Sequence, residues 1–185
     1  YEDAVRSSAQ DALESGKVLY FPKLPFLLAA DEAGLLTETL SNGRAKNISR
    51  DPDGRIQGDT ASPEESARLS TMMARFASQS HELVLGLFPG FVAGIEQART
   101  SYRPVEIAGR SYSPRNDDKR LHVDAFPSRP QRGRRILRLF SNIHPMGGKR
   151  VWHVGFRSLP MQRRLRMKVS GPQSSFCRIT SGLLS

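Results

Sequence analysis

Helix-forming and strand-forming patterns occupy different parts of this 185-residue chain. Before residue 97 most apolar residues recur at helical spacing, most clearly over positions 69–87. After residue 100 they gather in short runs separated by Pro and Gly, a pattern typical of strands. Helices followed by strands with short turns predict an α+β fold. We expect an antiparallel barrel or jelly roll braced by the N-terminal helices.

The clearest local signal is a helix start at Ser62-Pro63-Glu64-Glu65, where Ser62 can cap the helix and Glu65 can reach back to it. The apolar stripe that follows predicts packing against a sheet, and Met72 and Met73 belong to it as core residues. The segment 44–61 is rich in Gly and Asp and predicts a long loop. Other helices are expected over 2–15, 31–42 and 89–97, and other strands over 18–21, 100–107, around 122, 135–143 and 150–155.

The net charge of +10 comes entirely from the C-terminal third. No Asp or Glu follows Asp124, whereas 13 Lys and Arg do, so the first 124 residues carry a net charge of −3. A cationic surface of this kind suits anionic partners such as lipid phosphates or nucleic acid. The single cysteine, Cys177, fits a reducing cytoplasm, and the polar start of the chain predicts no signal peptide.

His122 and Asp124 flank Val123 in a strand-like segment that ends at Pro127. Residues two apart project from the same face of a strand, so the imidazole and the carboxylate would lie side by side. This pair supplies two of the three ligands of a two-His-one-carboxylate iron site. The alternative is a surface His beside a turn Asp, because a His-X-Asp pattern alone is common.

Arg138 lies between Leu137 and Leu139 in the apolar run 135–143. A buried guanidinium would need a carboxylate partner, which would have to be an upstream acid or a ligand. The alternative is that Arg138 points outward from an amphipathic strand. Both interpretations stay open at this stage.

Several stretches resemble the Kdo hydroxylases, bacterial dioxygenases that use iron and 2-oxoglutarate to hydroxylate the sugar acid Kdo (keto-deoxy-octulosonate) of lipopolysaccharide. The similarity covers about five sixths of the chain and ends at Gly155. It is carried by Gly16–Phe26, Lys46–Ser49, Ala98–Ile107, Asp117–Ser128, Arg134–Ile143 and Val151–Gly155.

The resemblance implies an α+β fold with a double-stranded β-helix (jelly-roll, cupin-like) core, braced by N-terminal helices and incomplete at the C-terminus. It also implies a function and roles for particular residues. His122 and Asp124 would bind Fe(II) and carry the catalysis, and Arg138, Arg120 and Arg103 would be candidates to bind 2-oxoglutarate or the acid group of Kdo. Ascorbate is a candidate reductant. The implied substrate is a Kdo-containing lipid A precursor, reached by peripheral contact at the cytoplasmic face of the inner membrane, and no nucleic-acid partner is expected.

The sequence departs from the family pattern after Gly155. The family supplies a distal His for iron much later in the chain, whereas no His follows His153 here, and residues 156–185 hold six bases and no acid. We therefore expect residues 1–155 to form the N-terminal and central part of a dioxygenase domain. Residues 156–185 are interpreted as a basic tail of the kind that a frameshifted or truncated reading frame would give. Without the distal His, this chain would be inactive. His144 and His153 remain alternative third ligands.

A second function remains possible on the charge pattern alone. Arg132, Arg134, Arg135 and the segment 163–168 could bind phosphates of nucleic acid or anionic lipid without catalysis. The two readings differ in a simple test, because the enzyme binds 2-oxoglutarate in a manner that depends on Fe(II) and His122. A basic module instead binds polyanions in a salt-sensitive manner and is indifferent to His122.

Overall fold

The structure is a computed structural model that describes residues 2–41, 47–104, 134–144, 146–148, 150–155, 164–169 and 175–181. The chain divides into two compact units. We call Leu27–Arg110 the helical unit, and Glu2–Phe26 together with Ser111–Ser185 the split unit, because its two parts come from opposite ends of the chain.

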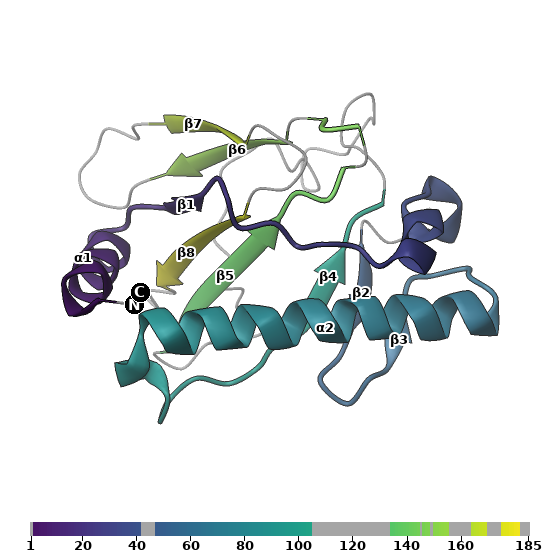
Figure 1. Ribbon diagram of the computed structural model, residues 1–185, viewed down its shortest axis with the longest axis horizontal. Coiled ribbons are helices and arrows are strands. Elements are labelled where there is room, and N and C mark those ends of the chain that lie inside the picture. Colours follow the sequence, from purple (N-terminus) through teal and green to yellow (C-terminus); the bar gives the residue numbers. More distant parts are fainter. Residues whose placement is uncertain are drawn as a thin grey trace. The chain divides into compact units, whose positions relative to one another are not determined.

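The helical unit contains a small antiparallel sheet and one long helix. Strand β2 (Ile48–Arg50) lies between β3 (Ile56–Gln57) and β4 (Thr100–Tyr102). Helix α2 (Pro63–Leu87) contacts both β2 and β4, and it extends along this sheet in Figure 1. Antiparallel strands with one face against a helix form a two-layer α+β arrangement.

A tight turn over Asp51–Gly54 connects β2 and β3. Gly54 donates its N–H to the carbonyl of Asp51 over 2.9 Å, and Gly54 has a φ of +94°. Pro52 presets the second turn position, and Gly54 accepts the left-handed backbone that closes the hairpin. The expected loop over 44–61 is therefore wrong in its middle part, where two short strands form.

Helix α2 begins where the sequence predicted. The Ser62 hydroxyl accepts from the N–H of Glu65, and the Glu65 carboxylate accepts from the N–H of Ser62 over 2.9 Å. These two bonds satisfy N–H groups that the first helical turn would otherwise leave unpaired. The apolar stripe is buried as expected, including both methionines, at Leu69, Met72, Met73, Val84 and Leu87.

Two short 3-10 helices, η1 (Ala30–Leu35) and η2 (Glu38–Leu40), replace the single helix expected over 31–42. Thr37 interrupts the helical path, because its hydroxyl accepts from the N–H of Thr39 at the start of η2. A third, η3 (Pro89–Phe91), follows α2. Buried Glu32 joins η1 to α2 through an ion pair with Arg75.

The split unit contains α1 (Asp3–Glu14) and a three-stranded antiparallel sheet. Strand β8 (Ser175–Ser181) lies between β1 (Leu19–Phe21) and β5 (Arg135–Ser141), as Figure 1 shows. The register pairs Cys177 with Leu19 on one side and with Leu139 on the other. The last described strand of the chain is thus the central strand of this sheet.

A second pair of strands, β6 (Arg150–Gly155) and β7 (Arg164–Val169), forms an antiparallel ribbon in the same unit. Strands β7 and β8 both lie within residues 156–185, the segment expected to be a basic tail. The α+β class is confirmed, and so are the helices over 3–14 and 63–87 and the strands β1, β5 and β6. In the described part of the chain, no helix has the length and apolar character that a membrane crossing requires.

Candidate functional site

Arg103 follows β4 directly and is half-buried. Its Nε donates to Oδ1 of Asn47 over 2.8 Å, and Asn47 is the residue that precedes β2. The register explains this contact, because Ile48 pairs with Tyr102 and the next positions outward are Asn47 and Arg103. The bond fixes one side of the guanidinium at the end of the sheet.

The other end of the same two strands carries a cluster around Asp51. The carboxylate of Asp51 is buried and accepts from Nε of Arg99 over 2.7 Å and from Nε2 of Gln57 over 2.9 Å. Arg55 lies 3.3 Å from the same carboxylate. The hydrogen bond from Arg99 is the main reason why the pKa of Asp51 is lowered below its ordinary value. Gln57, Arg55 and Arg99 thus converge on this one carboxylate and tie β3 and the start of β4 to the end of β2.

Arg138 lies in the middle of β5 and is exposed. The register places Arg178 of β8 directly opposite it. Of the two interpretations from the sequence, the outward orientation agrees with the exposure of the Arg138 side chain. Its proposed role with 2-oxoglutarate remains a prediction, because an exposed Arg can also bind a carboxylate.

His144 forms part of a turn after β5. Its Nδ1 accepts from the backbone N–H of Met146 over 3.2 Å and of Gly148 over 3.0 Å, while Asn142 Nδ2 donates to the carbonyl of Gly148. An accepting Nδ1 requires the proton to be on Nε2, so neither nitrogen presents a lone pair to a metal. His144 therefore serves as a turn scaffold, and this argues against its use as the third iron ligand.

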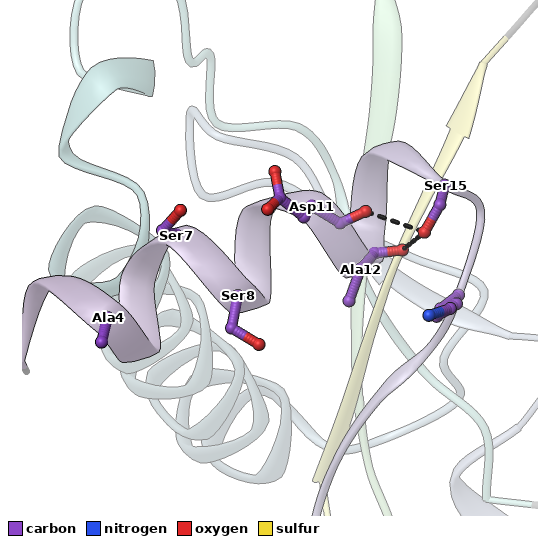
Figure 2. A pocket seen from close by; sticks show the side chains of 7 residues that line it. Ala4, Ser7, Ser8, Asp11, Ala12 and Ser15 are labelled. Carbon is purple, nitrogen blue, oxygen red and sulfur yellow. Dashed lines mark hydrogen bonds between the residues drawn. The ribbon is translucent and has the colours of Figure 1, made fainter.

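An open depression runs along α1 in the split unit. Figure 2 shows small and polar side chains on its wall, and Ser15 donates from its hydroxyl to the carbonyls of Asp11 and Ala12 at the end of the helix. These bonds satisfy carbonyls at the helix terminus. The lining residues include no His and none of the predicted site residues, and they are Ala4, Ser7, Ser8, Asp11, Ala12, Ser15 and Lys17.

The sequence-predicted iron ligands His122 and Asp124 lie outside the described residues, and so does Arg120. The side chain of His153, the other alternative third ligand, is likewise not described. Among the described residues, no cluster of three His, Cys, Asp or Glu side chains could hold a metal ion. The proposed metal site therefore rests on the sequence pattern and on relatives of the chain.

Comparison with known proteins identifies such relatives. The profile of a family described as 3-deoxy-D-manno-oct-2-ulosonic acid (Kdo) hydroxylase matches residues 1–183. The apo structure of the Kdo hydroxylase KdoO, a non-heme Fe(II) alphaketoglutarate-dependent dioxygenase, is similar with a TM-score of 0.87 and 31% identity. This similarity covers 96% of the present chain and 77% of KdoO. No curated protein sequence matches the chain.

Further structures of KdoO match equally well. The complex with cobalt(II) has a TM-score of 0.87 and 31% identity over 98% of this chain and 81% of that one. The complex with alphaketoglutarate and Fe(III) has a TM-score of 0.86 and 31% identity over 96% of this chain and 77% of that one. The class that these relatives define is the non-heme Fe(II) dioxygenases.

Within that class, the chain belongs to the Kdo hydroxylase family and is homologous to KdoO. The match with the family extends to residue 183, beyond the point at Gly155 where the resemblance read from the residues ended. The strands β7 and β8 lie in this added part. The C-terminal segment therefore belongs to the region of family similarity.

Sequence reasoning missed the polar contacts on both sides of β2, because residues 44–61 were interpreted as a loop. A usable signal was present in Asp51-Pro52-Asp53-Gly54, since Pro followed by Asp-Gly is a turn pattern between two strands. That hairpin would have placed Asn47 and Asp51 at opposite ends of one strand. Their partners Arg103 and Arg99, which flank β4, could not have been assigned without the register.

Proposed function

We propose that this protein is an Fe(II)- and 2-oxoglutarate-dependent dioxygenase that hydroxylates the Kdo sugar of a lipid A precursor. The observation that carries the proposal is the family match over residues 1–183, combined with the pair His122 and Asp124 inside the matched region. The similar KdoO structures contain alphaketoglutarate with Fe(III) in one case and succinate with Fe(III) in another. Succinate is the expected product of 2-oxoglutarate after oxidative decarboxylation.

His122 and Asp124 would hold the iron, because a neutral imidazole and an ionised carboxylate are ligands that suit Fe(II) and leave positions open for other groups. When bound, the iron supplies oxygen activation coupled to decarboxylation of the keto acid. Arg103, Arg120 and Arg138 would bind carboxylates of the keto acid or of the sugar. The fold around the site would be a double-stranded β-helix. Ascorbate would serve as the reductant, and the enzyme would act at the cytoplasmic face of the inner membrane.

Within residues 1–185, His122 and Asp124 would supply two ligands. His144 is engaged in its turn, so His153 is the remaining candidate for a third ligand among the alternatives from the sequence. The product of turnover would be Kdo that has gained one oxygen atom.

Anaerobic titration with Fe(II) and 2-oxoglutarate tests the proposal. The chelate of Fe(II) with a keto acid gives a visible charge-transfer absorption, which His122→Ala and Asp124→Ala should weaken at least about 100-fold in apparent affinity. His81→Ala, on α2, is the matched control and should bind as the parent does. Binding that is indifferent to His122 would contradict the proposal.

The alternative, a basic module that binds polyanions, predicts salt-sensitive binding with no requirement for iron. One contact weakens this alternative. Arg135, one of its proposed phosphate ligands, is paired with Glu14 of α1, and their second hydrogen bond measures 2.6 Å. Titration of the parent chain and of His122→Ala with anionic vesicles, with and without added salt, separates the two functions. A basic module should bind the vesicles equally in both chains and lose them at high salt.

A further inference from the structure

The chain leaves helix α2 through a run in which no side chain is polar, from residue 83 to residue 95. The first part of this run lies in the helix, where Val84 and Leu87 are buried. The second part contains η3 and the turn after it, at the left end of α2 in Figure 1. Segments that connect helices and strands on a protein surface are normally polar, so this composition is unusual for a connection.

The second part of the run is exposed to solvent. Residues 89–94, which we call the apolar tip, are all exposed except the half-buried Phe91. Val92 is 59% exposed. A Cβ atom added at Gly90 or at Gly94 would meet no non-neighbouring atom within 4 Å. The apolar tip therefore projects from the helical unit with open space around it.

The apolar tip is anchored to the end of α2 and has an ordered backbone. Phe88 has no exposed surface and stacks on Phe91, with the two ring centroids 5.2 Å apart. The N–H of Phe91 donates to the carbonyl of Phe88 over 2.9 Å. The N–H groups of Gly94 and Ile95 both donate to the carbonyl of Phe91, each over 2.9 Å. Because the tip is ordered before it binds anything, little conformational entropy is lost on binding.

The size of the apolar tip and the charge of the chain together favour a membrane as its partner. Exposed apolar surface marks contact with another protein or with a membrane. A stable protein interface takes roughly 20–30 residues from each partner, which residues 89–94 alone do not provide. Insertion of a few apolar side chains at a membrane surface needs less area, provided that attraction to anionic lipids adds a second contribution. The net charge of +10 supplies that attraction.

We propose that the apolar tip inserts into the headgroup region of an anionic bilayer and so holds the enzyme on the membrane that carries its substrate. This inference deepens the proposed function and rests on it for the lipid-borne substrate. Val92 is the side chain that would contact lipid directly. Phe88 and Phe91 maintain the shape of the tip and act through it.

The experiment measures flotation of the full 185-residue chain with vesicles of phosphatidylethanolamine and phosphatidylglycerol, without iron or keto acid. Val92→Asp should weaken binding about 10-fold or more, because a charge replaces an apolar side chain at the lipid boundary. The factor should be the same at low and at high salt, and the melting temperature should not change. Val5→Asp is the matched control, because Val5 is 48% exposed on α1 and the same charge is added outside the tip. It should bind as the parent does.

Gly90→Trp tests insertion in the opposite direction. Gly90 is not one of the glycines with positive φ and has open space around it, so a larger side chain should cause no strain. Trp favours the membrane–water interface, and vesicle binding should become about 3- to 10-fold tighter. In a Trp152→Phe background the new Trp is the only one in the chain, and its emission should shift to shorter wavelength on vesicles. Gly34→Trp, in the equally open surroundings of η1, is the matched control and should show no shift.

The inference is overturned if the parent chain does not float with the vesicles, if Val92→Asp and Val5→Asp weaken binding equally, or if the emission of Gly90→Trp does not shift. Oligomers of the parent that Val92→Asp dissolves, without vesicle binding, would also overturn it, because a second copy would then cover the tip. Vesicle binding that depends on Val92, without any iron-dependent turnover, would reject only the proposed function. Iron-dependent turnover, with vesicle binding indifferent to Val92, would reject only the inference.

Discussion

The helical unit and the split unit both contain a three-stranded antiparallel sheet, but the two sheets are assembled from very different separations in sequence. In the helical unit, β2 and β3 are joined by a turn of a few residues, and β4 ends at Tyr102. In the split unit, Cys177 of β8 pairs with Leu19 of β1 on one side and with Leu139 of β5 on the other. Long loops must close before the second sheet gains any contacts, whereas the β2–β3 hairpin of the first sheet can form locally.

The largest expected effect comes from disrupting that strand. Cys177→Pro removes a backbone N–H at the central strand of the split unit, a place where proline is not tolerated, and should destabilise this sheet by roughly 3 kcal/mol or more. Hydrogen exchange should show lost protection of amides in β1 and β5, while α2 keeps its protection. Cys177→Ala is the control and should leave all of them protected. Retained protection of β5 in the proline variant would contradict the central position of β8.

A smaller effect is expected in the helical unit from Arg75→Ala. The side chain of Glu32 is only 6% exposed, and loss of Arg75 would leave its carboxylate without the guanidinium. Because Arg75 itself is 31% exposed, we expect a cost of roughly 2–3 kcal/mol, less than for a fully buried pair. Denaturant unfolding followed by helical circular dichroism measures it. Arg68→Ala, on the same helix and also bonded to η1, is the control and should cost little.

The smallest expected effect is on the pH dependence of stability, and it involves one acid in each unit. The hydrogen bond from Arg135 lowers the pKa of Glu14 in the split unit, and the bond from Arg99 lowers the pKa of Asp51 in the helical unit. A folded-state pKa below the unfolded value stabilises the fold at neutral pH, and that contribution is lost as the pH falls through the folded value. Unfolding measured between neutral pH and about pH 3 should therefore be less pH-dependent in Glu14→Gln and Asp51→Asn. An unchanged pH profile would show that the acids titrate normally.

An element could be predicted from the sequence when the residues that form it lie close together along the chain. The start of α2 was predicted to the residue, because Ser62 and Glu65 are three positions apart and satisfy the helix end by themselves. The helix expected over 31–42 was wrong in type, because Thr37 redirects the chain through its own hydrogen bond. Strand β2 was missed, because three residues carry too little periodicity to be recognised.

In the candidate site too, some features depend on residues close together in the sequence and others on residues far apart. The pair His122 and Asp124 and the membership of the family follow from residues close together in the sequence, and the family match bears out the membership. The contact between Asn47 and Arg103 joins positions 56 apart and depends on the register of two short strands. No local pattern in the sequence marks Asn47 as the partner of Arg103.

The sequence by itself therefore determined the family, the α+β class, the helix start at Ser62 and the candidate iron ligands. These features depend on side-chain chemistry and on interactions within a few residues along the chain. Tertiary structure alone decided that the last described strand is the central strand of a sheet and that Asn47 holds Arg103. Each of these depends on which distant backbone groups pair, and that pairing results from packing of the whole chain.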